Sequence, residues 1–178
     1  VRIAVGRPVA GGVYAIDGVL RDDRDGFAVD LRPILSLPGA HNWQNACAAY
    51  AACRALGLER DSIAAGLRSY PGLAHRQERV VEISGIAYVN DSKATNADAA
   101  EKALSSYDAI YWIAGGRAKE GGIEGLRPLF PRVVHAFLIG EAAPDFARSL
   151  DGAGPHSQCG TMEAAPRAAH AMAQRERR

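Results

Sequence analysis

The sequence predicts an α/β protein whose second half is a doubly wound, mainly parallel sheet. From about residue 79 onward, strand-like apolar runs alternate with helix-like runs, which is the pattern of a parallel sheet with crossover helices. Residues 110–114 and 136–139 are apolar throughout, as expected for strands that helices cover on both faces. In such sheets ligands bind beyond the carboxyl ends of the strands, so the loops that follow these strands are the ones to inspect.

The first 38 residues predict short strands at 3–5, 13–16 and 27–31, separated by Gly, Pro and Asp clusters. Residues 13–20 fit a hairpin with Asp17-Gly18 as its turn. Strands this short need partners, and we expect those of residues 1–38 to lack the partners that a missing half of the domain would supply.

Helical patterning follows. An Ala-rich run from 43 to 56 predicts a helix with Asn42 as its N-cap and Gly57 as its stop. Asp61 is the expected cap of a second helix at 62–69.

The pair Pro71-Gly72 is the best linker candidate in the chain. After it, strands are expected at 80–83, 86–89, 110–114 and 133–139. Helices are expected at about 97–106, 123–130, 143–150 and 162–174.

Composition narrows the class of protein. A formal net charge of +1 favours neither a nucleic acid nor a membrane surface as partner. No apolar run approaches the roughly 20 residues that span a bilayer, and we expect a cytoplasmic protein. The three cysteines, Cys47, Cys53 and Cys159, lack C-x-x-C spacing, and we interpret them as reduced thiols rather than metal ligands.

Three polar segments stand where strands end or helices begin. The first contains Asn42 and Asn45, whose spacing of three places both amides on one side of a helix start. An amide offers the donor and the acceptor that an adenine edge needs, although Asn42 also suits a plain N-cap. The second contains His75 and Arg76; the arginine fork suits phosphate, while a solvated arginine and a structural histidine are the alternatives.

The third segment, residues 90–96, is the densest polar cluster, with Asp91, Lys93 and Thr95 at its centre. The alternative interpretation of this segment is a turn in which Ser92, Thr95 or Asn96 caps the next helix. Only three of the 21 basic residues are lysines, and two of these, Lys93 and Lys119, follow predicted strands. Lys119 comes after the pair Gly115-Gly116, whose lack of side chains lets a backbone approach an anion closely.

Taken in order, these segments resemble the Mur ligase family of ATP-dependent peptidoglycan amide ligases, and within it the branch that adds D-glutamate. The resemblance covers roughly residues 36–174 and rests on four motifs. They are His41-Asn42-x-x-Asn45, Gly72-Leu73-x-His75-Arg76, Asn90-Asp91-Ser92-Lys93-Ala94-Thr95-Asn96 and Gly115-Gly116-x-x-Lys119. The stretch 91–96 is the most specific of the four.

The resemblance implies that residues 1–73 are the end of the family's central ATPase domain. Residues 74–178 would be most of its Rossmann-like C-terminal domain, truncated at its end. The P-loop, the metal-binding residues and a carbamylated lysine would lie upstream of Val1, so we expect a fragment that is inactive by itself. The complete enzyme is expected to be a monomer.

The implied reaction uses ATP and Mg²⁺ to phosphorylate the carboxylate of UDP-N-acetylmuramoyl-L-alanine, after which the amine of D-glutamate displaces phosphate. By the same resemblance, the residues expected to contact ATP are Asn42, Asn45, Arg76 and Asp91. The residues expected to bind D-glutamate are Lys93, Thr95 and Lys119, and Lys93 and His75 are the candidate catalytic residues. The alternatives are another Mur-type or folylpolyglutamate-type ligase, or a non-catalytic module that binds a nucleotide or an amino acid.

Overall fold

The computed structural model describes residues 1–117 and 121–176. It divides into two compact units, Val1–Asp91 and Ser92–Arg178, and each is described by itself. The predicted domain boundary between residues 73 and 74 stays a prediction.

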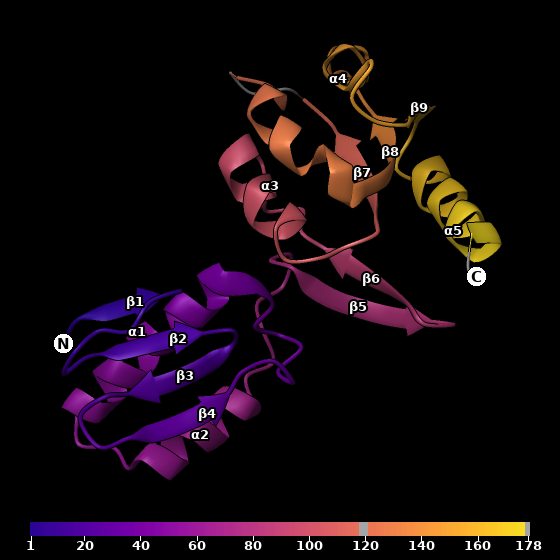
Figure 1. The fold of residues 1–178 in the computed structure, drawn as a ribbon. Helices are drawn as coiled ribbons and strands as arrows, with labels where there is room; N and C mark the ends of the chain where they lie inside the picture. The colour runs from indigo at the N-terminus through magenta and orange to yellow at the C-terminus, as the bar shows by residue number, and fades with distance from the viewer. Residues whose placement is uncertain (118–120, 177–178) are drawn as a thin grey trace. The chain divides into compact units, whose positions relative to one another are not determined.

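The first unit begins with a four-stranded sheet in the order β1-β2-β3-β4 (Figure 1). The strands are β1 (Ile3–Val5), β2 (Val13–Ile16), β3 (Val19–Asp22) and β4 (Phe27–Asp30). β1 pairs in parallel with β2, and the other pairs are antiparallel. The β2–β3 turn is Asp17-Gly18, with φ values of 48° and 75°, so the predicted hairpin is confirmed. Each of the four strands pairs with a neighbour in the unit.

Two helices follow the sheet, α1 (Gly39–Ala55), which packs on the strands, and α2 (Arg60–Arg68), which packs on α1. α1 begins earlier than predicted, and its N-cap is Pro38 without a side-chain hydrogen bond, so the cap assigned to Asn42 was wrong. α2 likewise begins before Asp61, which lies in the first turn, where a carboxylate favours the positive end of the helix dipole. Gly57 follows the end of α1 with a φ of 84°, as a helix stop should.

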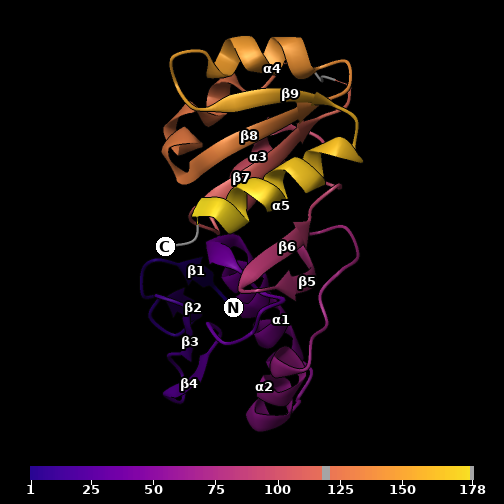
Figure 2. The same cartoon turned by 90° about the vertical axis from the view of Figure 1, so that its right-hand side faces the viewer.

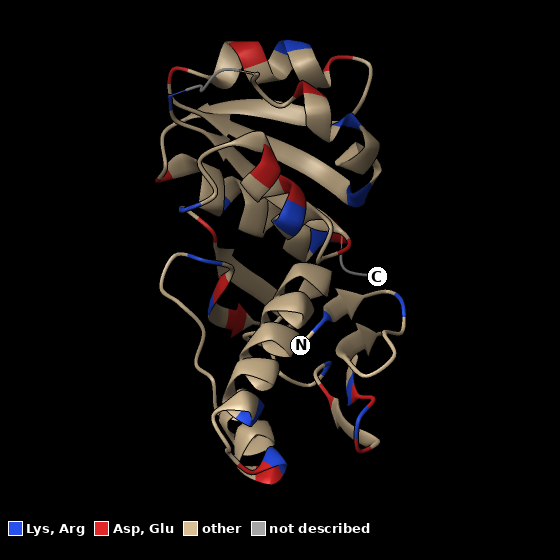
Figure 3. Cartoon of the chain, turned by 90° about the vertical axis from the view of Figure 1, so that its left-hand side faces the viewer, with Lys and Arg blue, Asp and Glu red and all other residues tan. Residues whose placement is uncertain are grey.

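The core of this unit is formed between the sheet and α1. Its fully buried members include Val13, Leu20, Leu31, Cys47 and Tyr50. The charge pattern of α1 fits this placement, because within the helix only Arg54, near its end, is charged (Figure 3). Burial of this apolar surface holds α1 in place, and with it the start of the helix, which carries Asn42 and Asn45.

The first unit ends in a hairpin of β5 (Glu78–Ile83) and β6 (Ile86–Asn90), joined by Ser84-Gly85. Both turn residues are left-handed, with φ values of 52° and 75°, as a tight two-residue hairpin turn requires. Among the described residues these two strands pair with each other alone, and the pairing is antiparallel. The prediction that they belong to the parallel sheet was therefore wrong, because a connection this short cannot make a parallel crossover.

The second unit is the predicted doubly wound fold, with a parallel sheet in the order β7-β8-β9. Its strands are β7 (Ile110–Gly115), β8 (Val133–Ile139) and β9 (His156–Gly160). Its helices are α3 (Ala97–Leu104), the 3-10 helix η1 (Glu124–Arg132), α4 (Ala143–Leu150) and α5 (Ala164–Glu176). The expected α-helix at 123–130 is a 3-10 helix, consistent with Pro128 and Pro131, which cannot donate to a helical ladder.

Helices cover both faces of this sheet (Figure 2). Leu104 of α3, Phe130 of η1 and Leu150 of α4 pack on one face, whereas Ala165 and Ala169 of α5 pack against the other. The fold class predicted from the sequence is thereby confirmed. Within the described residues, no helix has the length and apolar character needed to cross a bilayer.

Candidate functional site

The start of α1 presents the two predicted adenine contacts. Asn42 and Asn45 both lie in the first two turns, the former half-buried and the latter exposed. The Asn42 amide donates from Nδ2 to the carbonyl oxygen of Pro38 at 2.8 Å, across the first turn. Although Asn42 is not the N-cap, this bond holds its amide against the helix start, with the amide oxygen as an acceptor.

A buried glutamine links this helix start to the end of the hairpin. The side-chain nitrogen of Gln77 lies 3.1 Å from Nε2 of His41, in the first turn of α1. The backbone N–H of Gln77 donates to Oδ1 of Asp91 at 3.0 Å. Three segments far apart in sequence are thus joined through one side chain and one backbone group.

Asp91 is half-buried, and its burial raises the pKa of the carboxyl above its ordinary value. The backbone hydrogen bond from Gln77 and the nearby charges of His41 and Arg76 act in the opposite direction, because they favour the carboxylate. Arg76 itself is exposed, as a residue that meets a phosphate from solvent would need to be.

A second polar group surrounds His75 at the base of the hairpin. Nδ1 of His75 lies 2.9 Å from the side-chain nitrogen of Asn90. The carboxylate of Glu78 accepts from the backbone N–H of His75 at 2.8 Å and from Asn90 at 3.4 Å. With a φ of 64°, His75 is left-handed, so this backbone is held in a conformation that few residues other than glycine adopt. His75 is thereby fixed by hydrogen bonds, although its side chain stays exposed.

The segment after Asp91 belongs to the second unit. Lys93 and Thr95 are exposed, and the backbone N–H of Thr95 donates to the carbonyl oxygen of Lys93 at 2.9 Å. Asn96 is the N-cap of α3 and accepts from the N–H of Ala99 at 2.9 Å, which selects it among the three predicted caps. The turn therefore leaves the lysine and threonine side chains open to a ligand.

The pair Gly115-Gly116 does something other than predicted. The N–H of Gly116 donates to the carbonyl oxygen of Ile139 at 3.0 Å, so it is engaged by the neighbouring strand end. Gly115, with a φ of 143°, lies directly against the Ile139 backbone. The glycines thus allow two strand ends to approach closely. Lys119, the predicted D-glutamate contact after them, lies outside the described residues.

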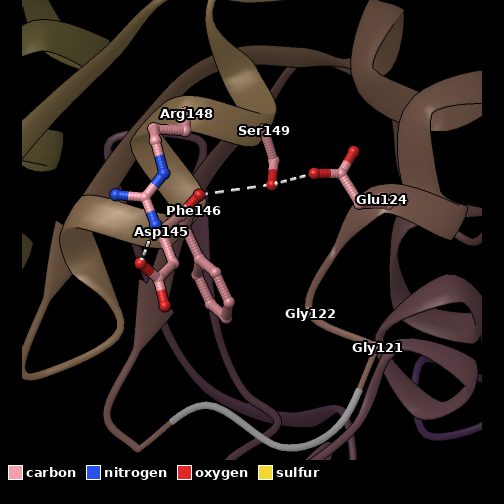
Figure 4. A pocket seen from close by; sticks show the side chains of 7 residues that line it. All are labelled: Gly121, Gly122, Glu124, Asp145, Phe146, Arg148 and Ser149. Carbon is pink, nitrogen blue, oxygen red and sulfur yellow. Dashed lines mark hydrogen bonds and ion pairs between the residues drawn. The ribbon is translucent and has the colours of Figure 1, made fainter.

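A pocket of about 450 Å³ lies between the start of η1 and α4 (Figure 4). Its lining residues are Gly121, Gly122, Glu124, Asp145, Phe146, Arg148 and Ser149. The hydroxyl of Ser149 donates to Glu124 at 2.6 Å and is the main cause of the lowered pKa of that carboxyl. The described residues with predicted roles do not line this pocket, and the contacts of Glu124 and Ser149 are those of a helix-packing network.

The structure therefore gathers Gln77, Asp91 and His41 in one cluster and His75 and Asn90 in another. Gln77 and Glu78 had no predicted role. Glutamine and glutamate are ordinary at the start of a strand, and only the left-handed backbone and the buried contacts single out these residues. The sequence around Gln77 contains no turn pattern that predicts a positive φ, in contrast to the Asp17-Gly18 pair.

The solved structures that share this fold include two Mur ligases. UDP-N-acetylmuramate–alanine ligase MurC from Thermotoga maritima superposes with a TM-score of 0.61 at 13% identity, covering 89% of this chain and 43% of the other. MurF from Acinetobacter baumannii gives a TM-score of 0.61 at 23% identity, covering 92% of this chain and 39% of the other. At these identities the likeness concerns the fold.

Sequence relatives are much closer in identity. The chain is 57% identical over 173 residues to the UDP-N-acetylmuramoylalanine–D-glutamate ligase of Paramagnetospirillum magneticum, covering 97% of this chain. It is 58% identical over 155 residues to the ligase of the same name from Rhodospirillum rubrum, and 53% identical over 176 residues to that of Rhizobium meliloti. No model of a known protein family matches the chain.

Over 97% of its length the chain is similar in sequence to D-glutamate-adding members of the Mur ligase family. The relatives named above are all D-glutamate ligases, as the stretch 91–96 predicted. The chain spans about 38% of the length of the first of these relatives, so it corresponds to a part of such an enzyme.

Proposed function

We propose that this chain is the C-terminal part of an ATP-dependent ligase that adds D-glutamate to UDP-N-acetylmuramoyl-L-alanine in peptidoglycan synthesis. The observation that carries the proposal is the 57% identity to a D-glutamate ligase, which extends over 97% of this chain. The complete enzyme is a cytoplasmic monomer whose partners are small-molecule substrates rather than nucleic acid or membrane.

In this proposal the first unit contacts the nucleotide. Asn42 and Asn45 bind the adenine edge, since each amide carries a donor and an acceptor. Arg76 and Asp91 contact phosphate and ribose. Burial raises the pKa of the Asp91 carboxyl, and a bound ribose would bury this carboxyl as well. The hydrogen bonds of Gln77 and His75 support these roles, because they fix the segment from which the contacts extend.

The incoming amino acid is assigned to Lys93, Thr95 and Lys119. D-Glutamate carries two carboxylates, and two ammonium groups in adjacent loops would neutralise them with charge-assisted hydrogen bonds. Lys93 also suits a catalytic role, because a positive charge near the acyl phosphate stabilises the developing negative charge. His75 is the second candidate catalytic residue.

Mg²⁺ is not assigned to this part of the enzyme. Within the described residues, no three His, Cys, Asp or Glu side chains come together as a metal site. We therefore derive no catalytic step from a metal here, and its ligands are expected in the rest of the ligase.

The proposal is tested with the purified complete ligase, by measuring phosphate release from ATP in the presence of UDP-N-acetylmuramoyl-L-alanine. Release should require D-glutamate and should not occur with L-glutamate, L-lysine or L-alanine in its place. Release that is independent of D-glutamate, or stronger with another amino acid, contradicts the assignment. The 178-residue chain alone should show no ligation; amide formation by this chain would contradict that expectation.

A further inference from the structure

Gln77 occupies a position that is unfavourable for two separate reasons. Its φ of 45° places a residue with a side chain in the left-handed region, which is unfavourable for all residues except glycine. The residue is 8% exposed, and its side-chain oxygen lacks a hydrogen-bond partner among the described atoms. Buried carbonyl oxygens normally have such a partner. Features that break local rules in this way are expected where a residue serves a site rather than the fold.

The unusual backbone of Gln77 accompanies two useful contacts. Its N–H donates to Oδ1 of Asp91, at the end of the hairpin, at 3.0 Å. Its side-chain nitrogen is 3.1 Å from Nε2 of His41, which stands directly before Asn42 in the first turn of α1. One residue therefore holds both the carboxylate assigned to the nucleotide and the helix turn that carries an assigned adenine contact.

The contact also gives the histidine ring an observable environment. Gln77 places its side-chain amide against Nε2 of His41, and the donor and acceptor roles in this pair depend on the histidine tautomer. The ring nitrogens of His41 therefore report whether the contact is present.

We propose that Gln77 is a positioning residue of the nucleotide site, which sets the His41 ring and the Asp91 carboxylate before ATP binds. The inference rests on the proposed function, since the role of Asp91 is assigned there. Gln77 itself touches neither substrate nor reacting atoms in this scheme. Its effect is therefore on ATP binding and not on the chemical step.

The first test is Gln77→Leu in the complete ligase. Leucine keeps the size and the backbone N–H but removes the bond to His41. The KM for ATP should rise about two- to tenfold, which is the range that one hydrogen bond of ordinary strength corresponds to. The kcat and the KM for D-glutamate should stay unchanged. The double variant Gln77→Leu/His41→Phe should be no worse than the worse of the two single variants, because both remove the same contact.

Two control variants separate positioning from stability. Ser84→Gly replaces another left-handed residue, in the turn at the far end of the hairpin, and Gln158→Leu removes an exposed glutamine in β9. Neither should change the KM for ATP. A Gln77→Leu enzyme whose KM for ATP equals that of the wild type would overturn the proposal. So would equal losses with all three substrates, which is the result expected of a structural role alone.

The second test does not depend on activity. In the 178-residue chain, Gln77→Leu should change the ¹⁵N chemical shifts of the His41 ring, because the substitution removes the hydrogen-bond partner of Nε2. A ring that is unaffected by the substitution contradicts the proposed contact. If the wild-type ligase uses ATP with a different amino acid, the proposed function fails, yet the ¹⁵N shifts of the His41 ring and the KM for ATP still decide the role of Gln77.

Discussion

Gly115 at the end of β7 lies so close to Ile139 at the end of β8 that a β-carbon on Gly115 would be 1.9 Å from the Ile139 carbonyl oxygen. The neighbouring Gly116 has open space around the same position. The two glycines of one motif therefore differ in whether they have room for a side chain, although both have positive φ values, 143° and 96°.

Gly115→Ala should destabilise the second unit strongly, by about 3 kcal/mol or more, because the contacting atom is backbone and cannot rotate away. Gly116→Ala should lower the free energy of unfolding by only about 1–2 kcal/mol, because the alanine would have to adopt a left-handed conformation but would meet no steric clash. Denaturant unfolding of both variants measures the difference. Equal losses of stability in the two variants would show that the ends of β7 and β8 lie further apart than described.

Asp91→Asn should increase stability at neutral pH while it impairs the use of ATP. Burial raises the pKa of Asp91 in the folded chain, so the fold favours the protonated acid. The stabilising contribution is therefore present below the ordinary pKa of an aspartate and is lost as the pH rises through the raised value. Asparagine cannot ionise, so it avoids this loss, and its oxygen can still accept from Gln77.

Thermal unfolding of wild type and Asp91→Asn across pH 3 to 8 measures this effect. The variant should have the higher midpoint at pH 7, and the difference should vanish toward pH 3. A variant that is less stable at pH 7 would show that the ionised carboxylate makes stronger contacts in the fold than its burial indicates.

Lys93→Ala in the complete ligase should raise the KM for D-glutamate by about ten- to a hundredfold, the range of a lost charge-assisted hydrogen bond. The KM for ATP should change far less. Lys119→Ala should act in the same direction. Lys102→Ala is the matched control, because Lys102 lies in the last turn of α3 and pairs with Glu101 at 3.3 Å. Equal effects of Lys93→Ala on ATP and D-glutamate contradict the assigned role.

Cys47 should resist alkylation in the folded chain. It is fully buried, and burial raises the pKa of its thiol to about 11, so the reactive thiolate is scarce at neutral pH. Cys53 and Cys159 are partly exposed and should react first. Mass spectrometry after brief iodoacetamide treatment, with and without denaturant, distinguishes the three. Modification of Cys47 before the other two would contradict its burial.

The sequence predicted the second unit better than the first. The continuous apolar runs that became β7 and β8 could be recognised because strands covered on both faces leave little room for polar residues. β9 was missed because its residues, His156–Gly160, are mostly polar, as an edge strand permits. The strands near residues 80 and 86 were found, but their pairing was not, since apolar character does not report strand direction.

The candidate site was predicted as a set of motifs rather than as an arrangement. Asn42 and Asn45 share a helix start, as expected. The role of Gly115 in close packing could not be predicted, because an anion and a carbonyl oxygen place the same demand on a glycine. Gln77 carried no signal at all, since its importance lies in a backbone torsion and a partner 36 residues away.

The hairpin β5–β6 keeps its polar contacts at one end and its Ser84-Gly85 turn at the other. A backbone ladder with one irregularity near Arg79 joins the two ends. A fluorophore or spin label attached at residue 84 would therefore lie at the opposite end of the hairpin from the contacts of Asp91 and His75. The same tip offers a place for a peptide tag, since a lengthened turn would disturb neither the ladder nor the buried glutamine.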